Sequence, residues 1–253
     1  KISGLSTVQV QALTTDQIME LVEAQIAALG AAQIQSLSAA QIKGLDDVEF
    51  LTTDQIKALT ATQVASLTAT QVSQLELDQM AAIETADIAA LTTAQISNLT
   101  TTQVAGLSES QVKALTTKQL VALTTGQAAK LTSDQVAALS TAAVKGLSVD
   151  QLSSITSTQL ANLTTAQVAV LTADQVAGLG SNQIVKLTTN QLRAVEVADV
   201  SALTSTQVNA LTTTQIGALT DKQVKALTTA QLEKLSTAQF AAITASDLVS
   251  LNA

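Results

Sequence analysis

The chain has 253 residues, with 12 basic and 20 acidic side chains and a net charge of −8. It contains no cysteine, histidine, proline, tryptophan or tyrosine, which excludes disulfides, thiolate metal sites, a histidine base and the aromatic platforms on which nucleic-acid bases stack. The acidic balance argues against nucleic acid and anionic membranes as partners. No run approaches the roughly 18 consecutive apolar residues of a membrane span.

An eight-residue pattern fills the first block, residues 1–44. Its octads open at regularly spaced leucines, each taken here as position 1: Leu5, Leu13, Leu21, Leu29 and Leu37. A fixed short period is typical of a repeat architecture, in which each unit buries its apolar face against its neighbours. The four residues before Leu5 read as the last half of an octad, so we expect the sequence to be a window of a longer array.

Residues 45–50 form an irregular hexad, Leu-Asp-Asp-Val-Glu-Phe. Aligned from Leu45, it lacks positions 7 and 8 and places Phe50 at position 6. We expect Phe50 to fill the space left by the missing residues, with a local kink in the array. Asp46, Asp47 and Glu49 make the hexad the densest acidic spot of the chain, and this pattern is more typical of a solvated turn than of an acid–base pair.

Residues 51–253 form a second block, in which the octads continue without interruption. Leu91-Thr92-Thr93-Ala94-Gln95-Ile96 shows the motif. Threonine or serine at position 2 with glutamine at position 5 is a capping box, and apolar residues at positions 1 and 6 form the hydrophobic staple around it. Each octad therefore carries its own helix start. Phe240 also occupies position 6, where we expect it to be part of the core.

The placement of charges supports helices rather than strands. Acidic residues gather at position 4, in the expected first turn, and basic residues at position 7, in the last, an order that a helix dipole favours and a strand does not. The acidic set is Asp16, Asp54, Asp78, Asp134, Asp150 and Asp174, and the basic set is Lys43, Lys57, Lys113, Lys145, Arg193 and Lys225.

One continuous helix is excluded by geometry. Eight residues at about 100° each overshoot two turns by about 80°, so the leucines would wind around the helix and leave no stripe to bury. We therefore predict an all-α solenoid of very short capped helices, one per octad, that forms a single domain over residues 1–253. Small residues at position 8 should let neighbouring backbones approach closely. The alternative is a parallel β-solenoid, which threonine and valine favour, although apolar positions 1, 6 and 8 do not alternate with period two.

Three octads replace glutamine by aspartate: 83–90 with Asp87, 195–202 with Asp199 and 243–250 with Asp247. A cation site is one interpretation, and an aspartate cap in place of glutamine is the simpler one, since hard cations need several converging oxygens. The first two aspartates lie fourteen octads apart and the third six octads further on. Because both spacings are even, they favour two octads per coil of the solenoid.

The sequence predicts no catalytic, cofactor-binding or metal-binding residues, and hence no enzyme. Hydroxyl groups are abundant, but no histidine is present to activate them, and lysine is sparse. A glycine-rich phosphate loop and the glycine-rich calcium repeat are both missing from the sequence.

The tandem Leu-Thr-(Thr/Ala/Ser)-x-Gln-(Val/Ile/Leu)-x-Ala units resemble the octad arrays of very large bacterial secreted and surface proteins of adhesin-like type. Members of that group often carry proline at position 3, which this chain lacks. The resemblance implies an extracellular or cell-surface role as a rod, spacer or filament that continues or self-associates end to end. The alternative function is a surface-binding module, in which regular threonines bind ice or glycans, unless capping turns their hydroxyls back to the backbone.

Overall fold

The computed structural model describes residues 2–243, and this part of the chain is entirely helical. It contains 29 α-helices of four to six residues and two 3-10 turns, and no strand is present among these residues. The prediction of an all-α solenoid with one short helix per octad is confirmed, and the β-solenoid alternative is wrong.

The contacts divide the chain into two compact units, residues 1–130 and residues 131–253. The helices of the first unit are η1 (Ile2–Gly4), α1 (Thr7–Gln11), α2 (Thr15–Met19), α3 (Glu23–Ile26), α4 (Ala31–Ser36), α5 (Ala39–Lys43), η2 (Val48–Phe50), α6 (Thr53–Ala58), α7 (Ala61–Ser66), α8 (Ala69–Gln74), α9 (Leu77–Ala82), α10 (Thr85–Ile88), α11 (Thr93–Asn98), α12 (Thr101–Gly106), α13 (Glu109–Ala114), α14 (Thr117–Val121) and α15 (Thr125–Ala128).

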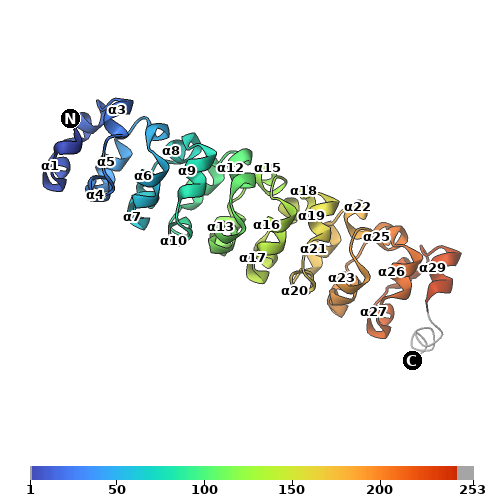
Figure 1. Cartoon of the computed structure of the whole chain (residues 1–253). Helices are drawn as coiled ribbons and strands as arrows, with labels where there is room; N and C mark the ends of the chain where they lie inside the picture. The colour runs from blue at the N-terminus through green and yellow to red at the C-terminus, as the bar shows by residue number, and fades with distance from the viewer. Residues whose placement is uncertain (1, 244–253) are drawn as a thin grey trace. The chain divides into compact units, whose positions relative to one another are not determined.

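The helices of the second unit repeat the same plan (Figure 1). They are α16 (Ser133–Ala138), α17 (Thr141–Gly146), α18 (Val149–Ser154), α19 (Ser157–Ala161), α20 (Thr165–Val168), α21 (Ala173–Gly178), α22 (Ser181–Ile184), α23 (Thr189–Ala194), α24 (Val197–Val200), α25 (Ser205–Ala210), α26 (Thr213–Gly217), α27 (Asp221–Lys225), α28 (Thr229–Leu232) and α29 (Thr237–Ala242).

Most helices begin at a capping box, and the apolar residue that opens the next octad follows at or just beyond their C-terminal end. In α11, Thr92 is the N-cap with an extended backbone, and both bonds of the box are present. Leu99 then takes φ −55° and ψ 140°, which leaves the helical region, while its N–H still bonds Ile96 O at 3.2 Å. The helix therefore stops after about two turns without glycine or proline, and the chain changes direction at every octad.

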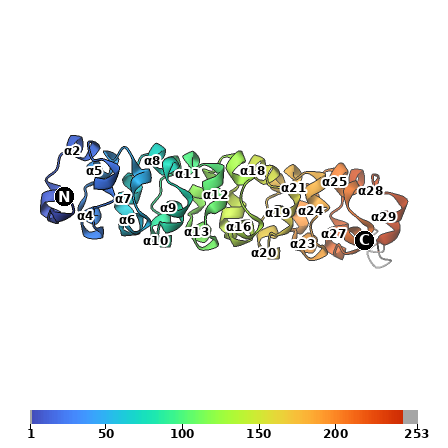
Figure 2. The same ribbon diagram turned by 45° about the horizontal axis from the view of Figure 1, so that its top comes forward.

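Three octads make one coil, so helices three units apart lie against each other in stacks (Figures 1 and 2). In the first unit the stacks are α1-α4-α6-α9-α12-α15, α2-α5-α7-α10-α13 and η2-α8-α11-α14. In the second unit they are α16-α19-α22-α25-α28, α17-α20-α23-α26-α29 and α18-α21-α24-α27. The expectation of two octads per coil is wrong, because within each unit the helices in contact are three octads apart.

Positions 1 and 6 form the core, and small residues at position 8 let adjacent coils approach. Ile96 is fully buried and Leu99 is 4% exposed, and the same two positions are buried in almost every other octad. In the stack of α18 and α21, Gly178 faces Val149, and a Cβ added to the glycine would lie 2.1 Å from Val149 Cγ1. At this pair, the missing side chain at position 8 makes room for the valine at position 3 one coil earlier.

The hexad occupies the place of a whole octad in its coil, and the expected role of Phe50 is wrong. Val48 is the fully buried residue, whereas Phe50 is only partly buried. The carbonyls of Val48 and Leu51 accept from Gln79 with sequence separations of 31 and 28, the same separations that join Gln95 to Val64 and Leu67. The two missing residues therefore precede Val48, and a 3-10 turn replaces the helix.

The prediction that Phe240 is part of the core is also wrong. It occupies position 6 of its octad, which predicts a core side chain, but it is 46% exposed. A position 6 side chain is covered by the coil that follows it, and α29 has no following coil within the described residues. The Asp247 octad lies outside the described residues.

We expect Gly178→Ala to destabilise the fold by about 1–3 kcal/mol, the usual range for overpacking, because the added methyl group meets the stiff side chain of Val149. Gly126→Ala is the matched control: a Cβ there meets only the Thr124 hydroxyl of its own cap, at 3.9 Å, so it should be neutral or stabilising. Thermal unfolding of both variants, and of Gly178→Ala combined with Val149→Ala, checks this. A failure of the double variant to recover stability would contradict the packing argument.

Candidate functional site

The most extensive polar arrangement in the molecule is a network of glutamine side chains that joins successive coils. Gln95 shows its geometry. Thr92 N–H donates to Gln95 Oε1 at 2.6 Å, and Gln95 N–H donates to Thr92 Oγ1 at 3.2 Å. The other end of the amide reaches the preceding coil, where Nε2 donates to Val64 O at 2.9 Å and Leu67 O at 2.7 Å. One side chain thus caps its own helix and binds the backbone of another.

The same arrangement recurs through both units. In the second unit, Gln207 Nε2 donates to Val176 O at 2.9 Å and Leu179 O at 2.6 Å. The acceptors are carbonyls at and just beyond the C-terminal end of a helix, where intrahelical donors run out. Val176 O accepts from Leu179 N–H at 3.4 Å as well as from Gln207. Twenty-three glutamines are buried. The buried polar side chains are therefore neutral amides with hydrogen-bond partners, and the interior contains few charged groups.

Apart from the hexad, two aspartates and one alanine interrupt the network within the described residues. Asp87, Ala143 and Asp199 each occupy position 5, and they follow one another at intervals of seven octads. Neither aspartate completes a capping box, and both short helices, α10 and α24, have a glutamate as N-cap in place of threonine. Their carboxylates cannot donate to a carbonyl, so Leu59 and Leu171 lack the glutamine donor that Leu67 has.

The electrostatics of the two aspartate octads are alike. Burial raises the pKa of Asp87 above its usual 3.8, and the negative charge of Glu84 raises it further. Asp199 has a raised pKa for the same two reasons, with Glu196 as the neighbour. The folded protein therefore holds these carboxyls in surroundings that disfavour their charge.

Stability should consequently rise in acid at these two octads. With a folded-state pKa above that of the unfolded chain, each aspartate destabilises the fold at neutral pH and ceases to do so as pH falls through the folded pKa toward 3.8. We expect the variant Asp87→Gln/Asp199→Gln to be more stable than the wild type at pH 7, by an amount that shrinks toward pH 4. Denaturant unfolding at several pH values measures the difference.

Ala143→Gln is the control for that experiment, because it adds a glutamine without removing a carboxylate. Its stability gain should stay constant between pH 7 and pH 4. If the gain of the double aspartate variant were equally constant, the acid sensitivity would not come from these two groups.

Loss of several network glutamines should destabilise the first unit strongly. Replacing Gln95, Gln103, Gln111 and Gln119 by alanine leaves buried carbonyls and cap N–H groups without partners, at about 1–3 kcal/mol for each unsatisfied group. The comparison variant carries alanine at Gln9, Gln17 and Gln25, which cap their helices but bind no preceding coil, and should lose only about 0.5–2 kcal/mol per cap. Equal losses per residue in calorimetry would show that the inter-coil bonds contribute nothing.

The threonines of the motif divide into two roles. The position 2 hydroxyl accepts from the glutamine N–H in nearly every octad, as Thr164 does from Gln167 at 3.2 Å. Position 3 is free of the cap, and in the stack from α17 to α29 it is threonine in every coil. This row consists of Thr141, Thr165, Thr189, Thr213 and Thr237, of which Thr189 is partly buried and the others are exposed.

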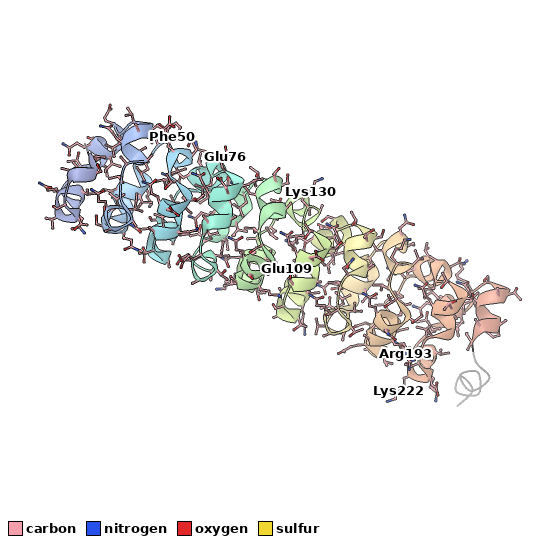
Figure 3. The ribbon with its side chains drawn as sticks, viewed as in Figure 1. Phe50, Glu76, Glu109, Lys130, Arg193 and Lys222 are labelled. Atoms are coloured by element: carbon pink, nitrogen blue, oxygen red, sulfur yellow. The ribbon has the colours of Figure 1, made fainter. Side chains whose placement is uncertain are left out.

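The charged side chains are distributed over the surface, and few of them form ion pairs. Glu76, Glu109 and Lys130 of the first unit and Arg193 and Lys222 of the second are all exposed, and they come from different helices and loops (Figure 3). Ion pairs within residues 2–243 are two, both between neighbours on one helix: Lys57 with Asp54 and Lys113 with Glu109. Such exposed pairs contribute little to stability.

The acidic hexad residues do not come together as a metal site. Asp46 and Asp47 are exposed, whereas Glu49 is partly buried with its Oε2 atom enclosed and without a hydrogen-bond partner among the described residues. Within residues 2–243, no group of three or more acidic, histidine or cysteine side chains is placed to hold a metal ion.

Five tandem matches to one family model run through the middle of the chain. The model describes the ALTTAQ repeat, and the matches cover residues 80–117, 111–141, 129–165, 157–189 and 184–221. Together they span residues 80–221, more than half of the sequence. The chain belongs to the ALTTAQ repeat family.

The ALTTAQ motif itself is read literally at Ala90–Gln95, from the small residue of position 8 to the glutamine of position 5. In the structure, the first alanine lies where adjacent coils approach, the leucine lies in the core, and the first threonine caps the helix. The second threonine and the second alanine are exposed in the first turn, and the glutamine amide binds the preceding coil. No curated protein matches the sequence. No helix in the described part of this ALTTAQ chain is long and apolar enough to cross a membrane.

Proposed function

We propose that this ALTTAQ repeat chain is a non-catalytic structural protein, a rod, spacer or filament module at the bacterial cell surface. The observation that carries the proposal is the glutamine network, which within each unit joins successive coils by the same bonds, from one glutamine per octad to carbonyls 31 and 28 residues earlier. An array built in this way gains length by adding coils and needs no specialised site. The resemblance to octad arrays of secreted and surface proteins supports the extracellular location.

The first described coil, α1 to α3, shows what one coil offers to the next. The amide nitrogens of Gln9, Gln17 and Gln25 have no acceptor among the described residues, although their Oε1 atoms cap as usual. Gln9 and Gln17 are exposed and Leu5, Leu13 and Leu21 are only partly buried, whereas the same positions are buried in nearly all interior coils. Three free donors beside partly uncovered leucines match the surface that an interior coil buries, so this coil is suited to receive another, in a longer array or from a second copy.

End-to-end association of the 253-residue chain is the corresponding prediction. Light scattering and electron microscopy over a wide concentration range should show linear assemblies. Gln9→Glu/Gln17→Glu/Gln25→Glu should suppress them, because glutamate keeps the acceptor of each cap but removes the amide donors and adds negative charge at the receiving coil. Gln74→Glu is the matched control, since Gln74 is also exposed but lies on α8 in a later coil. A monodisperse monomer at every concentration would contradict self-association.

The proposed location has its own experiment. Antibodies against this chain should label intact cells of the bacterium that produces it, and mild protease treatment of those cells should remove the label. A cytoplasmic protein serves as the control for cell integrity. Labelling that requires permeabilised cells would place the protein inside and contradict a cell-surface role.

A second candidate function is binding to ice or to surface glycans through regular threonines, and the row Thr141, Thr165, Thr189, Thr213 and Thr237 is the observation that favours it. The position 2 hydroxyls are engaged in caps, so only position 3 is available. Replacing the exposed members of the row with lysine should abolish any inhibition of ice recrystallisation or binding to glycan-coated beads. Activity that survives the replacement would exclude the row.

A further inference from the structure

A surface cleft of about 330 Å³ crosses three coils of the second unit, and its lining differs from that of the other clefts. It lies along the stack α22, α25 and α28, of which α25 and α28 are neighbours in Figure 2. The residues that line it are Ser181, Ser205, Thr206, Asn209, Ala210 and Lys234. These residues are spread over 54 positions of sequence and meet only because each coil returns the chain to the same stack.

One wall of the cleft is held by a hydrogen bond between coils that does not involve glutamine. Asn209 Nδ2 donates to Lys234 O at 2.6 Å. This bond fixes the end of α25 against the turn that follows α28 and holds the backbone of Lys234 in place. The amide oxygen of Asn209 remains as an acceptor beside the hydroxyl groups of the two serines.

The charge of the cleft is opposite to that of the chain. Lys234 is its charged lining residue, and it forms no ion pair among the described residues. Three comparable clefts have carboxylates in their linings: one has Glu84 with Lys57, one has Glu196 and Asp199 with Lys145, and one has Glu76 without a lysine. In a protein of net charge −8, a cleft that combines hydroxyls and an ammonium group without a carboxylate selects for a ligand with negative charge.

We infer that this cleft binds a sugar acid, as a free monosaccharide or as a residue of a polysaccharide. The ammonium group of Lys234 would pair with the carboxylate of the sugar, and the hydroxyls of Ser181 and Ser205 would exchange hydrogen bonds with its hydroxyls. The volume lies at the lower end of the range of small-molecule sites, about 300–1,000 Å³. A single ammonium matches a single carboxylate, whereas phosphate sites usually gather several N–H donors. This binding activity goes beyond the structural role and does not depend on it.

The test is isothermal titration of the full chain with D-glucuronate and with a glucuronate-containing oligosaccharide, and with D-glucose and inorganic phosphate as comparison ligands. Saturable binding of either glucuronate form, weaker by at least tenfold for glucose and phosphate, is expected. Binding of the oligosaccharide alone would identify the polysaccharide as the source. Lys234→Ala should lower the affinity at least tenfold, and Ser181→Ala/Ser205→Ala severalfold.

Lys186→Ala is the matched control. Lys186 holds the same position 8 of an octad in the same stack, but it does not line the cleft, so its removal should leave the affinity unchanged. The inference is overturned if glucuronate does not bind in either form, if phosphate binds as well as glucuronate, or if Lys234→Ala has no larger effect than Lys186→Ala. Circular dichroism of each variant verifies that the helices are retained.

Discussion

The side-chain amide of one glutamine per octad holds two segments of backbone together, and the rest of the structure depends on it. A helix of four to six residues has few internal hydrogen bonds, so most of its N–H and C=O groups need partners from elsewhere. Gln95 supplies both kinds of partner, as an acceptor for the N–H of its own cap and as a donor to carbonyls one coil earlier. Apolar side chains alone would bury these N–H and C=O groups without giving them hydrogen-bond partners. Each unsatisfied group costs free energy of folding, and each octad contributes only two large apolar side chains to offset that cost.

Much of the fold could be predicted because its signals are local. The capping box, the staple and the small residue at position 8 all act within eight residues or against the nearest coil. The number of octads per coil could not be predicted, since it depends on where the free half of the glutamine amide binds, 28 and 31 residues away. A signal was nevertheless present: a capping box accepts glutamate as readily as glutamine, yet no octad has glutamate at position 5. The preference for glutamine over glutamate indicates that the N–H₂ group of the amide is used.

Alignment explains the error at the hexad. Counting forward from Leu45 places Phe50 in the core, but counting back from Leu51 places Val48 there, three residues before the next leucine, as Ile96 precedes Leu99. The turn between position 6 and the following leucine is kept, because Leu51 N–H still donates to Val48 O at 3.1 Å. The cleft on α22, α25 and α28 was equally beyond sequence reasoning, because Ser181, Asn209 and Lys234 become neighbours only in a coil of three octads.

The three-octad coil also determines what a change in repeat number does to such a protein. Almost every octad has the same core positions and the same amide, so the loss of one octad leaves the packing of a unit almost intact. It nevertheless moves every later octad to the next stack, and residues that shared one side of the solenoid are separated. Only gains or losses in multiples of three keep surface features in line. A change in repeat number therefore alters which surface residues lie in line with one another, while the core positions and the inter-coil hydrogen bonds are largely kept.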